Sequence, residues 1–340
     1  MKKIFIIIIA LLLSLPASAQ FKKRIKQFDD FMGRRYYKVN YDTTYMIRPP
    51  HSRWTIKLSS ILAWSEYKIT GRHTETETTF KSTLKSDINP TFSISLGYYG
   101  FGASFSMSFN NDKGKKSNDF ELRFNSYGNA FGFDVTLNQI HSLSCDFLMK
   151  YDGTTYKLIF PENFVTQTNL SAYCYYAFNK KRFSYPAAFT QGYIQKRSAG
   201  SLLVGAAVNV NITDVGNIEE HPEDSTSVLY IVNSKMGLGL GYGYNLVLPH
   251  NWLIHASAIP YVIFRGYCYY LIYGDQDEKE NAHIPEVFLV SRCAVVHSFG
   301  NSGRWFFGLT AQNNFSEIES TDLTTRHTLW EFIGFFGVRL

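Results

Sequence analysis

From Trp54 onward, apolar and polar residues alternate along the chain with a period of two. The runs 54–59, 120–125, 131–138 and 330–339 place most of their large apolar side chains on every second position. A period of two indicates β-strands that have one apolar and one polar face. No stretch after Trp54 carries a long helical stripe. The sequence therefore predicts an all-β domain.

The connections between the expected strands alternate between short turns and long polar loops. Short turns are expected at 99–100, 126–129, 179–181, 249–251 and 300–303. Long polar connections are expected at 71–88, 110–118, 139–163, 213–228, 274–283 and 319–325. Tight turns at one end and longer loops at the other are typical of outer-membrane barrels. We therefore expect a transmembrane antiparallel β-barrel with both chain ends on the periplasmic side.

Twelve strands account for the alternating runs. They are expected near 53–69, 89–98, 101–110, 118–126, 130–139, 164–178, 198–212, 232–248, 252–273, 284–299, 304–318 and 326–340. A hairpin signal at 151–154 could add a pair, which leaves fourteen strands as an alternative. The last strand is alternating and aromatic, and it resembles the terminal signal read by barrel-assembly machinery. Leu340 stands where that signal usually has an aromatic residue.

Charged residues on the polar face of the strands are expected to line the lumen. Parity assigns to this face Lys57, Glu121, Arg123, Asp134, Arg265, Arg292, Glu331 and Arg339. One interpretation is a ladder of charges that selects solutes crossing a pore. The other is a set of mutually paired charges that fill a closed lumen. The narrow interior of a barrel of about twelve strands favours the second interpretation.

Two features suggest that a segment packs inside the barrel. Gly237, Gly239, Gly241 and Gly243 share one face of a strand, and such a row permits close approach of another segment. Residues 182–197 fit no strand, so they are the first candidate for lumenal packing. The basic segment 21–38 is the second candidate. Simple curvature of the barrel wall is the alternative explanation of the glycines.

The N-terminal region differs from the barrel. Residues 1–19 have a charged start, an apolar core and a small-x-small end at Ala17–Ala19, which predicts a secretory signal peptide. Residues 20–52 are basic and are expected to form a periplasmic or lumenal segment before the barrel at 53–340. Within this segment the spacing of four apolar residues predicts a helix with one apolar stripe: Phe21, Ile25, Phe28 and Met32. Such a helix could lie on the inner leaflet or plug the lumen, or the segment could be a solvated leader.

Composition narrows the class of protein further. The 340 residues are 16% aromatic and only 18% charged, against a usual charged share of about 25%. This excludes a disordered chain. After residue 15 no apolar run approaches the roughly 20 residues that a spanning helix needs. The formal charge of +6, or +4 without Lys2 and Lys3, is too weak to indicate nucleic acid as a partner.

Candidate chemistry is sparse. His141 and Ser144 lie near an expected strand end, but their spacing puts them on opposite faces, so a lipid-acting enzyme is only an alternative. No residue pattern indicates a metal or a cofactor. The cysteines are Cys145, Cys174, Cys268 and Cys293. A bridge between Cys268 and Cys293 is conceivable because they fall on strands expected to be neighbours; otherwise these are small residues that face lipid or a neighbouring strand.

Several short runs resemble an uncharacterised domain-of-unknown-function family of outer-membrane barrels of Gram-negative bacteria. They are Asp42-Thr43-Thr44-Tyr45, Trp54-Thr55-Ile56-Lys57, Lys181-Arg182-Phe183-Ser184-Tyr185, Ala187-Ala188-Phe189, Gln195-Lys196 and Ser198-Ala199-Gly200-Ser201. The resemblance covers most of the expected mature chain. It implies a location and an architecture, and it transfers no catalytic residue.

Three functions follow as hypotheses. The first is a monomeric, porin-like channel or transporter for small solutes in the cell outer membrane. The second is a closed structural barrel that binds partners through its extracellular loops. The third is a lipid-acting enzyme. The expected partners are outer-membrane lipid, the barrel-assembly machinery during biogenesis and, for the first function, small solutes.

Overall fold

The computed structural model describes residues 19–50, 52–73, 78–86, 88, 90–108, 119–151, 153–215, 228–272, 278–282, 284–319 and 323–340. The chain divides into two units, Met1–Asn40 and Tyr41–Leu340, and each is considered by itself. Residues 1–18 lie outside the described part, so cleavage after Ala19 stays a prediction.

The first unit contains the helix α2 (Ala19–Tyr37). This helix confirms the helical spacing read from Phe21 to Met32. Its predicted position, on a membrane or inside the lumen, stays a prediction. No helix among the described residues is both long enough and apolar enough to cross a bilayer.

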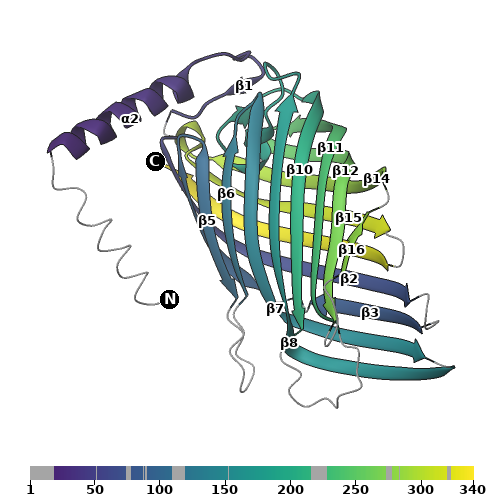
Figure 1. Cartoon of the computed structure of the whole chain (residues 1–340). Helices are drawn as coiled ribbons and strands as arrows, with labels where there is room; N and C mark the ends of the chain where they lie inside the picture. Colours follow the sequence, from purple (N-terminus) through teal and green to yellow (C-terminus); the bar gives the residue numbers. More distant parts are fainter. Residues whose placement is uncertain are drawn as a thin grey trace. The chain divides into compact units, whose positions relative to one another are not determined.

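In the second unit, twelve strands of the described chain close into a ring in which every neighbouring pair is antiparallel. The ring closes where β16 pairs with β2, beside one another in yellow and dark blue in Figure 1, and where β11 pairs with β12. The twelve strands are β2 (Trp54–His73), β4 (Thr91–Tyr98), β5 (Phe101–Ser108), β6 (Phe120–Tyr127), β7 (Phe131–Tyr151), β8 (Thr154–Ala177), β10 (Ala199–Val215), β11 (Val228–Leu248), β12 (Trp252–Ile272), β14 (Glu286–Phe299), β15 (Trp305–Glu319) and β16 (Leu323–Arg339). The predicted barrel and its strand number are confirmed.

Two further strands complete the sheet. β3 (Thr78–Ser86) lies between the second half of β2 and the second half of β7, and β13 (Glu278–Asn281) pairs with β12. The first halves of β2 and β7 are instead connected through β4, β5 and β6. The wall is therefore wider at the end where β4–β6 lie than at the end closed by β3.

Some of the polar regions expected to be long loops are strands. The hairpin signal at 151–154 is the turn between β7 and β8, with Gly153 at φ +72°, so it joins two of the twelve strands and adds no pair. Much of 71–88 and most of 139–163 likewise belong to β2, β3, β7 and β8. These segments were predicted as loops because the apolar alternation stops before them. The sheet continues beyond that point with a polar outward face.

The outward face of the barrel carries a broad apolar belt. Leu58, Phe92, Leu240 and Leu309 are each more than half exposed. Large exposed apolar surfaces are unusual on soluble monomers, whereas a lipid-facing barrel requires them. On β2 and β16 the belt ends at the cross-strand pair Trp64 and Trp330, the kind of aromatic boundary that favours a membrane–water interface.

The two ends of the barrel differ. At the end where Trp54 and Leu340 exchange main-chain hydrogen bonds, the connections are tight except for the one between β8 and β10. Turns there include Tyr99–Gly100 and His250–Asn251, all with positive φ, as two-residue hairpin turns of this kind require. A short 3-10 turn, η2 (Asn301–Gly303), makes another. We call this the short-turn end and the opposite one the long-loop end.

Candidate functional site: a plug and a charged layer

Residues 182–197 fold into the lumen at the short-turn end, in the connection between β8 and β10. They contain a one-turn helix, α3 (Tyr185–Phe189), and the two-residue strand β9 (Ile194–Gln195). Pro186 lies in the first helical turn, where backbone N–H groups have no acceptor within the helix. The lack of an N–H in proline therefore costs no helical hydrogen bond. We call residues 182–197 the plug.

Apolar contacts hold the plug against the barrel wall. Phe183 and Ala188 are fully buried, and Tyr185 is nearly so. One cluster joins Phe183 and Tyr185 to wall residues from several strands, including Tyr127, Tyr175, Leu203 and Ile259. A second cluster joins Ala187, Ala188, Tyr193 and other residues to Leu253, Ala294, Val296, Phe306 and Phe335. The plug therefore forms an apolar core with the inner wall.

Buried hydrogen bonds fix the plug in register. The Asn245 amide nitrogen donates to the Ser184 carbonyl (2.8 Å) and to Gln195 Oε1 (3.2 Å). The Ser184 N–H donates to Gln195 Oε1 (3.1 Å), and the Ser184 hydroxyl donates to Asn129 Oδ1 (2.8 Å). Because buried polar groups are costly when unpaired, these bonds favour one position of the plug.

The last strand also contacts the plug. Arg339 is fully buried and donates from Nε to the Gln191 carbonyl (2.8 Å). Its guanidinium also bonds the Gly303 carbonyl and lies over the Phe306 ring. Parity placed Arg339 inside the lumen, and there its side chain lies in the plug layer rather than in a ladder of charges.

A segment that sequence analysis missed completes the plug. The strand β1 (Met46–Ile47) pairs with β9, and the Asp42 N–H donates to the Lys181 carbonyl (2.9 Å). The Thr44 hydroxyl and backbone N–H both bond Asp42, which holds the pKa of that carboxyl below its usual value; Arg182 adds to the effect. The sequence did carry a hint of this contact, because two of the runs that resemble the family, 42–45 and 181–189, lie next to each other here.

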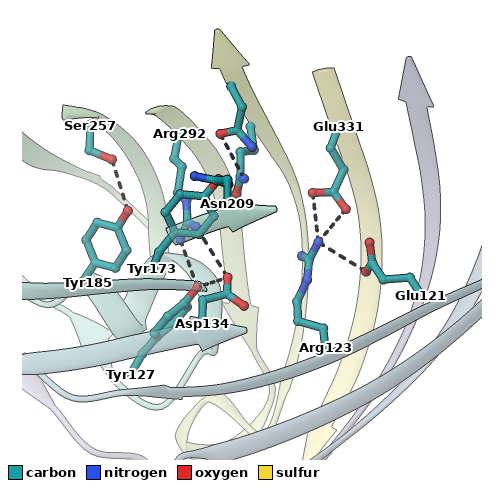
Figure 2. A network of polar contacts seen from close by, with 12 residues as sticks. Glu121, Arg123, Tyr127, Asp134, Tyr173, Tyr185, Asn209, Ser257, Arg292 and Glu331 are labelled. Carbon is teal, nitrogen blue, oxygen red and sulfur yellow. Dashed lines mark hydrogen bonds and ion pairs between the residues drawn. The ribbon is translucent and has the colours of Figure 1, made fainter. Parts of the chain in front are cut away.

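A layer of paired charges lies next to the plug, toward the long-loop end (Figure 2). Arg123 on β6 donates from one nitrogen to both carboxylate oxygens of Glu331 on β16, at 2.7 and 3.0 Å, and lies 3.2 Å from Glu121. The β6 and β16 strands are not neighbours in the ring. This ion pair therefore reaches across the lumen.

A second group in the same layer reaches across as well. Arg292 on β14 donates to the Tyr127 hydroxyl (2.9 Å) and lies 3.5 Å from Asp134 on β7, while the Tyr127 hydroxyl donates to Asp134 (2.6 Å). Figure 2 shows Tyr173, hydrogen-bonded to Asn209, beside this group. We call Glu121, Arg123, Asp134, Arg292 and Glu331 the charged layer.

The remaining predicted lumen charges behave differently from one another. Lys57 points inward and lies over the Phe335 ring at 5.1 Å. Arg265 is exposed, and its prediction was wrong. Phe264 forms a β-bulge, since Met236 pairs with Arg265 while Gly237 pairs with Ile263. The extra residue reverses the parity of β12, which a sequence pattern cannot locate. Lys235 on β11, which the sequence pattern did not single out, is buried inside the ring and donates to Ser316 on β15, a strand that is not its neighbour.

The glycine strip on β11 has two kinds of neighbour. A Cβ at Gly243 would lie 3.1 Å from the Phe183 ring, so the plug approaches the strip there. At Gly239 and Gly241 a Cβ would meet Ile259 and the carbonyls of β12. At Gly237 a Cβ would lie 2.8 Å from the Phe288 ring of β14, so the glycines face one plug residue, the adjacent strands and the Phe288 ring.

Toward the long-loop end, apolar side chains fill the lumen again. Buried residues from six strands form one cluster: Tyr67, Ile69, Leu84, Leu143, Cys145, Val165, Ile231 and Cys268. The Asn233 amide of β11 bonds the Tyr67 hydroxyl of β2, on the opposite side of the ring. We call this cluster the far apolar layer.

The cavities between these layers are small. One of about 60 Å³ lies among Arg123, Lys235 and Glu331, which is room for a few water molecules. Another of about 20 Å³ lies beside Arg292, Tyr185 and Ser257. Neither could hold a solute such as a sugar.

One hydrogen-bonded series has the order of a nucleophile, a base and an orienting amide. Ser257 Oγ lies 2.9 Å from His255 Nε2, and His255 Nδ1 lies 2.6 Å from Asn245 Oδ1. However, Tyr185 and Phe189 of the plug pack on the His255 ring. Since Ser257 faces only the 20 Å³ cavity, the series fits a polar support for the plug.

The candidate pair His141 and Ser144 is not brought together. In the described part of the chain, Ser144 Oγ donates to the Lys85 carbonyl (3.4 Å) and the His141 N–H donates to Asp119 (2.6 Å). The strand β7 is irregular between Ile140 and Cys145. No group of three or more possible metal-binding side chains occurs among the described residues.

The four cysteines form no disulfide with one another. Cys293 pairs with Ala256 on β12, whereas Cys268 lies twelve residues farther along that strand. At about 3.4 Å per residue the two positions are roughly 40 Å apart. The prediction that a Cys268–Cys293 bridge is conceivable was therefore wrong. The two cysteines do lie on neighbouring strands, but at positions far apart along them.

Comparison with known proteins places the chain in a family. A family model described as a domain of unknown function, DUF4421, matches residues 40–339. The chain belongs to the DUF4421 family. The matched region begins just before the segment that pairs with the plug, so in this DUF4421 protein the plug, its partner strand and the barrel fall within one family domain. None of the curated proteins matches significantly.

Solved structures resemble the chain only at low sequence identity and low TM-score. The β domain of the Bordetella autotransporter BrkA is 10% identical, with 84% of this chain and 99% of that chain covered and a TM-score of 0.36. The translocator domain of NalP from Neisseria meningitidis is 13% identical, with coverage of 95% and 100% and a TM-score of 0.33. The P. putida toluene transporter TodX is 8% identical, with coverage of 86% and 91% and a TM-score of 0.29. The strand pairing of the chain itself establishes the barrel.

Proposed function

We propose that this DUF4421 protein is a closed barrel of the cell outer membrane that serves as a scaffold and presents its long-loop end to partners outside the cell. The outer-membrane location is supported by the apolar belt and by the predicted signal peptide. The observation that carries the closed state is the filled lumen. The plug, the charged layer and the far apolar layer follow one another from the short-turn end to the long-loop end.

Contacts across the lumen support closure at each level. Arg339 and Asn245 bond the plug, Arg123 bonds Glu331, and Asn233 bonds Tyr67. An open pore needs a continuous water-filled path, but two cavities that lie between these contacts in the described part of the chain hold only about 60 and 20 Å³. A solute would have to displace all three layers.

The strands support a role outside the membrane. A strand needs about 9 to 11 residues to cross a bilayer, whereas β7 has 21 residues and β8 has 24. Beyond the apolar belt their exposed residues are mostly polar, for example Asp146, Lys150 and Lys157. This continuation forms a rigid platform on which partners can dock.

A gated channel is the second candidate function. It is favoured by one observation: the layer behind the plug contains ion pairs, as a pathway for charged solutes would. In that function the plug would leave the lumen to admit small solutes. The far apolar layer would then also need to rearrange, which makes this function the less well supported.

Planar-bilayer recordings test the proposal. Folded wild-type protein should give no steady current steps. A variant lacking residues 182–197 should stay silent or leak weakly, since the other two layers remain. Steady conductance of the wild type would overturn the closed scaffold. Large, stable steps of the deletion variant alone would favour the gated channel. Heat-modifiable electrophoretic mobility confirms that both proteins are folded.

A further inference from the structure

A cationic face lies on the outside of the barrel, just beyond the apolar belt. It consists of outward-facing residues on β2, β3 and β7: Lys68, Arg72, Lys81, Lys85 and Lys150. All but the half-buried Lys68 are exposed. Strand pairing places them side by side, because Thr70 is opposite Lys81, and Thr79 is opposite both Arg72 and Lys150.

The positive charge is only partly compensated. Among the described outward-facing residues of these strands, the carboxylates are Glu66, which lies 2.9 Å from Lys68 and 3.7 Å from Lys85, and Asp146. Five cations against two carboxylates leave a formal excess of three. Lys157 on β8 extends the face on one side. On the other side Arg326 of β16 lies opposite Glu317 of β15, and the positive face ends there.

Among the described residues at this level, the excess of positive charge lies on one side of the barrel. At a similar level, β15 presents Glu317 and Glu319, and β10 presents Asp214. A general solubility requirement would distribute both signs around the ring. The cations instead gather over the part of the wall that is closed by β3.

The height of the face above the belt indicates the size of its ligand. The belt ends at the Trp64–Trp330 pair, and Lys68 and Arg72 follow Trp64 by four and eight residues. With about 3.4 Å per residue and a strand tilt of about 40°, they lie roughly 10 and 20 Å beyond the interface. The polar layer of an ordinary bilayer is only about 5–8 Å thick on each side. Arg72 and Lys150 therefore lie above an ordinary phospholipid headgroup.

We propose that this cationic face binds phosphate groups on the saccharide headgroups of outer-leaflet lipids. Arginine and lysine bind phosphate through charge-assisted hydrogen bonds, and Thr70 and Thr79 supply hydroxyl donors between them. A phosphorylated saccharide reaches both the lower cations and the upper ones. The inference rests on the proposed membrane location and not on whether the lumen is closed.

Binding of purified rough lipopolysaccharide to the folded full chain in detergent tests this site. The variant carries Arg72→Gln, Lys81→Gln and Lys150→Gln together. Its matched control carries Lys180→Gln, Lys181→Gln and Arg304→Gln, three exposed cations at the short-turn end. We expect the first variant to lose affinity by about tenfold or more. The control should bind like the wild type, and enzymatically dephosphorylated lipopolysaccharide should bind the wild type as weakly as the variant.

Three results would overturn the proposal. They are unchanged affinity of the first variant, equal affinity for dephosphorylated lipopolysaccharide, and displacement of lipopolysaccharide by millimolar inorganic phosphate, which would indicate a site for free anions. Bilayer recordings on the same preparations separate this result from the closed-barrel proposal, since a conducting wild type that binds normally would overturn only the latter.

Discussion

Arg339 and Gln191 join the last strand of the barrel to its plug through a hydrogen bond of 2.8 Å from the guanidinium to a main-chain carbonyl. The two residues are 148 positions apart in the sequence. Because β16 also closes the ring against β2, the strand that completes the wall is one of those that bond the plug. Barrel closure and plug docking are thereby coupled.

Replacement of Arg339 should loosen this coupling. Arg339→Met keeps the bulk of the side chain but leaves the Gln191 and Gly303 carbonyls without their donor, at a cost of about 1–3 kcal/mol in the free energy of unfolding. Denaturant titration of the protein folded into lipid vesicles measures the change. Arg326→Met, an exposed position on the same strand, is the control and should differ little from the wild type.

Truncation of Phe183 should release the plug from the wall. The ring is fully buried against Gly243 and Leu203, so Phe183→Ala creates a cavity that costs about 3–5 kcal/mol. We expect trypsin to cut the folded variant at Lys196 or Arg197 at least tenfold faster than the wild type. The exposed Phe178 provides the control Phe178→Ala. Equal cleavage rates for Phe183→Ala and wild type would show that the ring does not hold the plug.

Removal of Arg123 should leave Glu121 and Glu331 facing one another without a cation between them. Loss of one member of a buried ion pair costs about 3–5 kcal/mol, because an uncompensated charge remains. Arg123→Met should therefore unfold at lower denaturant concentration. The triple change Arg123→Met, Glu121→Gln, Glu331→Gln should recover most of the loss. A triple variant no more stable than Arg123→Met alone would contradict the pairing.

The sequence was sufficient to predict the barrel because lipid and lumen impose a period of two on every strand. The alternation identified all twelve strands, and parity placed Lys57, Arg123 and Arg292 on the inward face. It failed at Arg265, where one extra residue in β12 shifts the parity. It also failed for β3, since a strand exposed to water carries no apolar signal.

The plug was only half predictable. Residues 182–197 stood out because they fit no strand, and the pattern could say that something packs inside. Their partners could not be found in this way. The pairing of β1 with β9 and the Arg339–Gln191 bond join residues more than a hundred positions apart. Such contacts depend on how the closed ring brings distant segments together.

Hydrogen–deuterium exchange of the plug in the wild-type barrel, reconstituted in lipid nanodiscs, tests the central claim most directly. The Ser184 amide bonds Gln195 and the Thr190 amide bonds the Pro186 carbonyl, both inside a buried layer. We predict that amides of 183–195 exchange as slowly as those of the barrel strands. Exchange of these amides as fast as at the exposed Ser302 would contradict a lumen closed by its own plug.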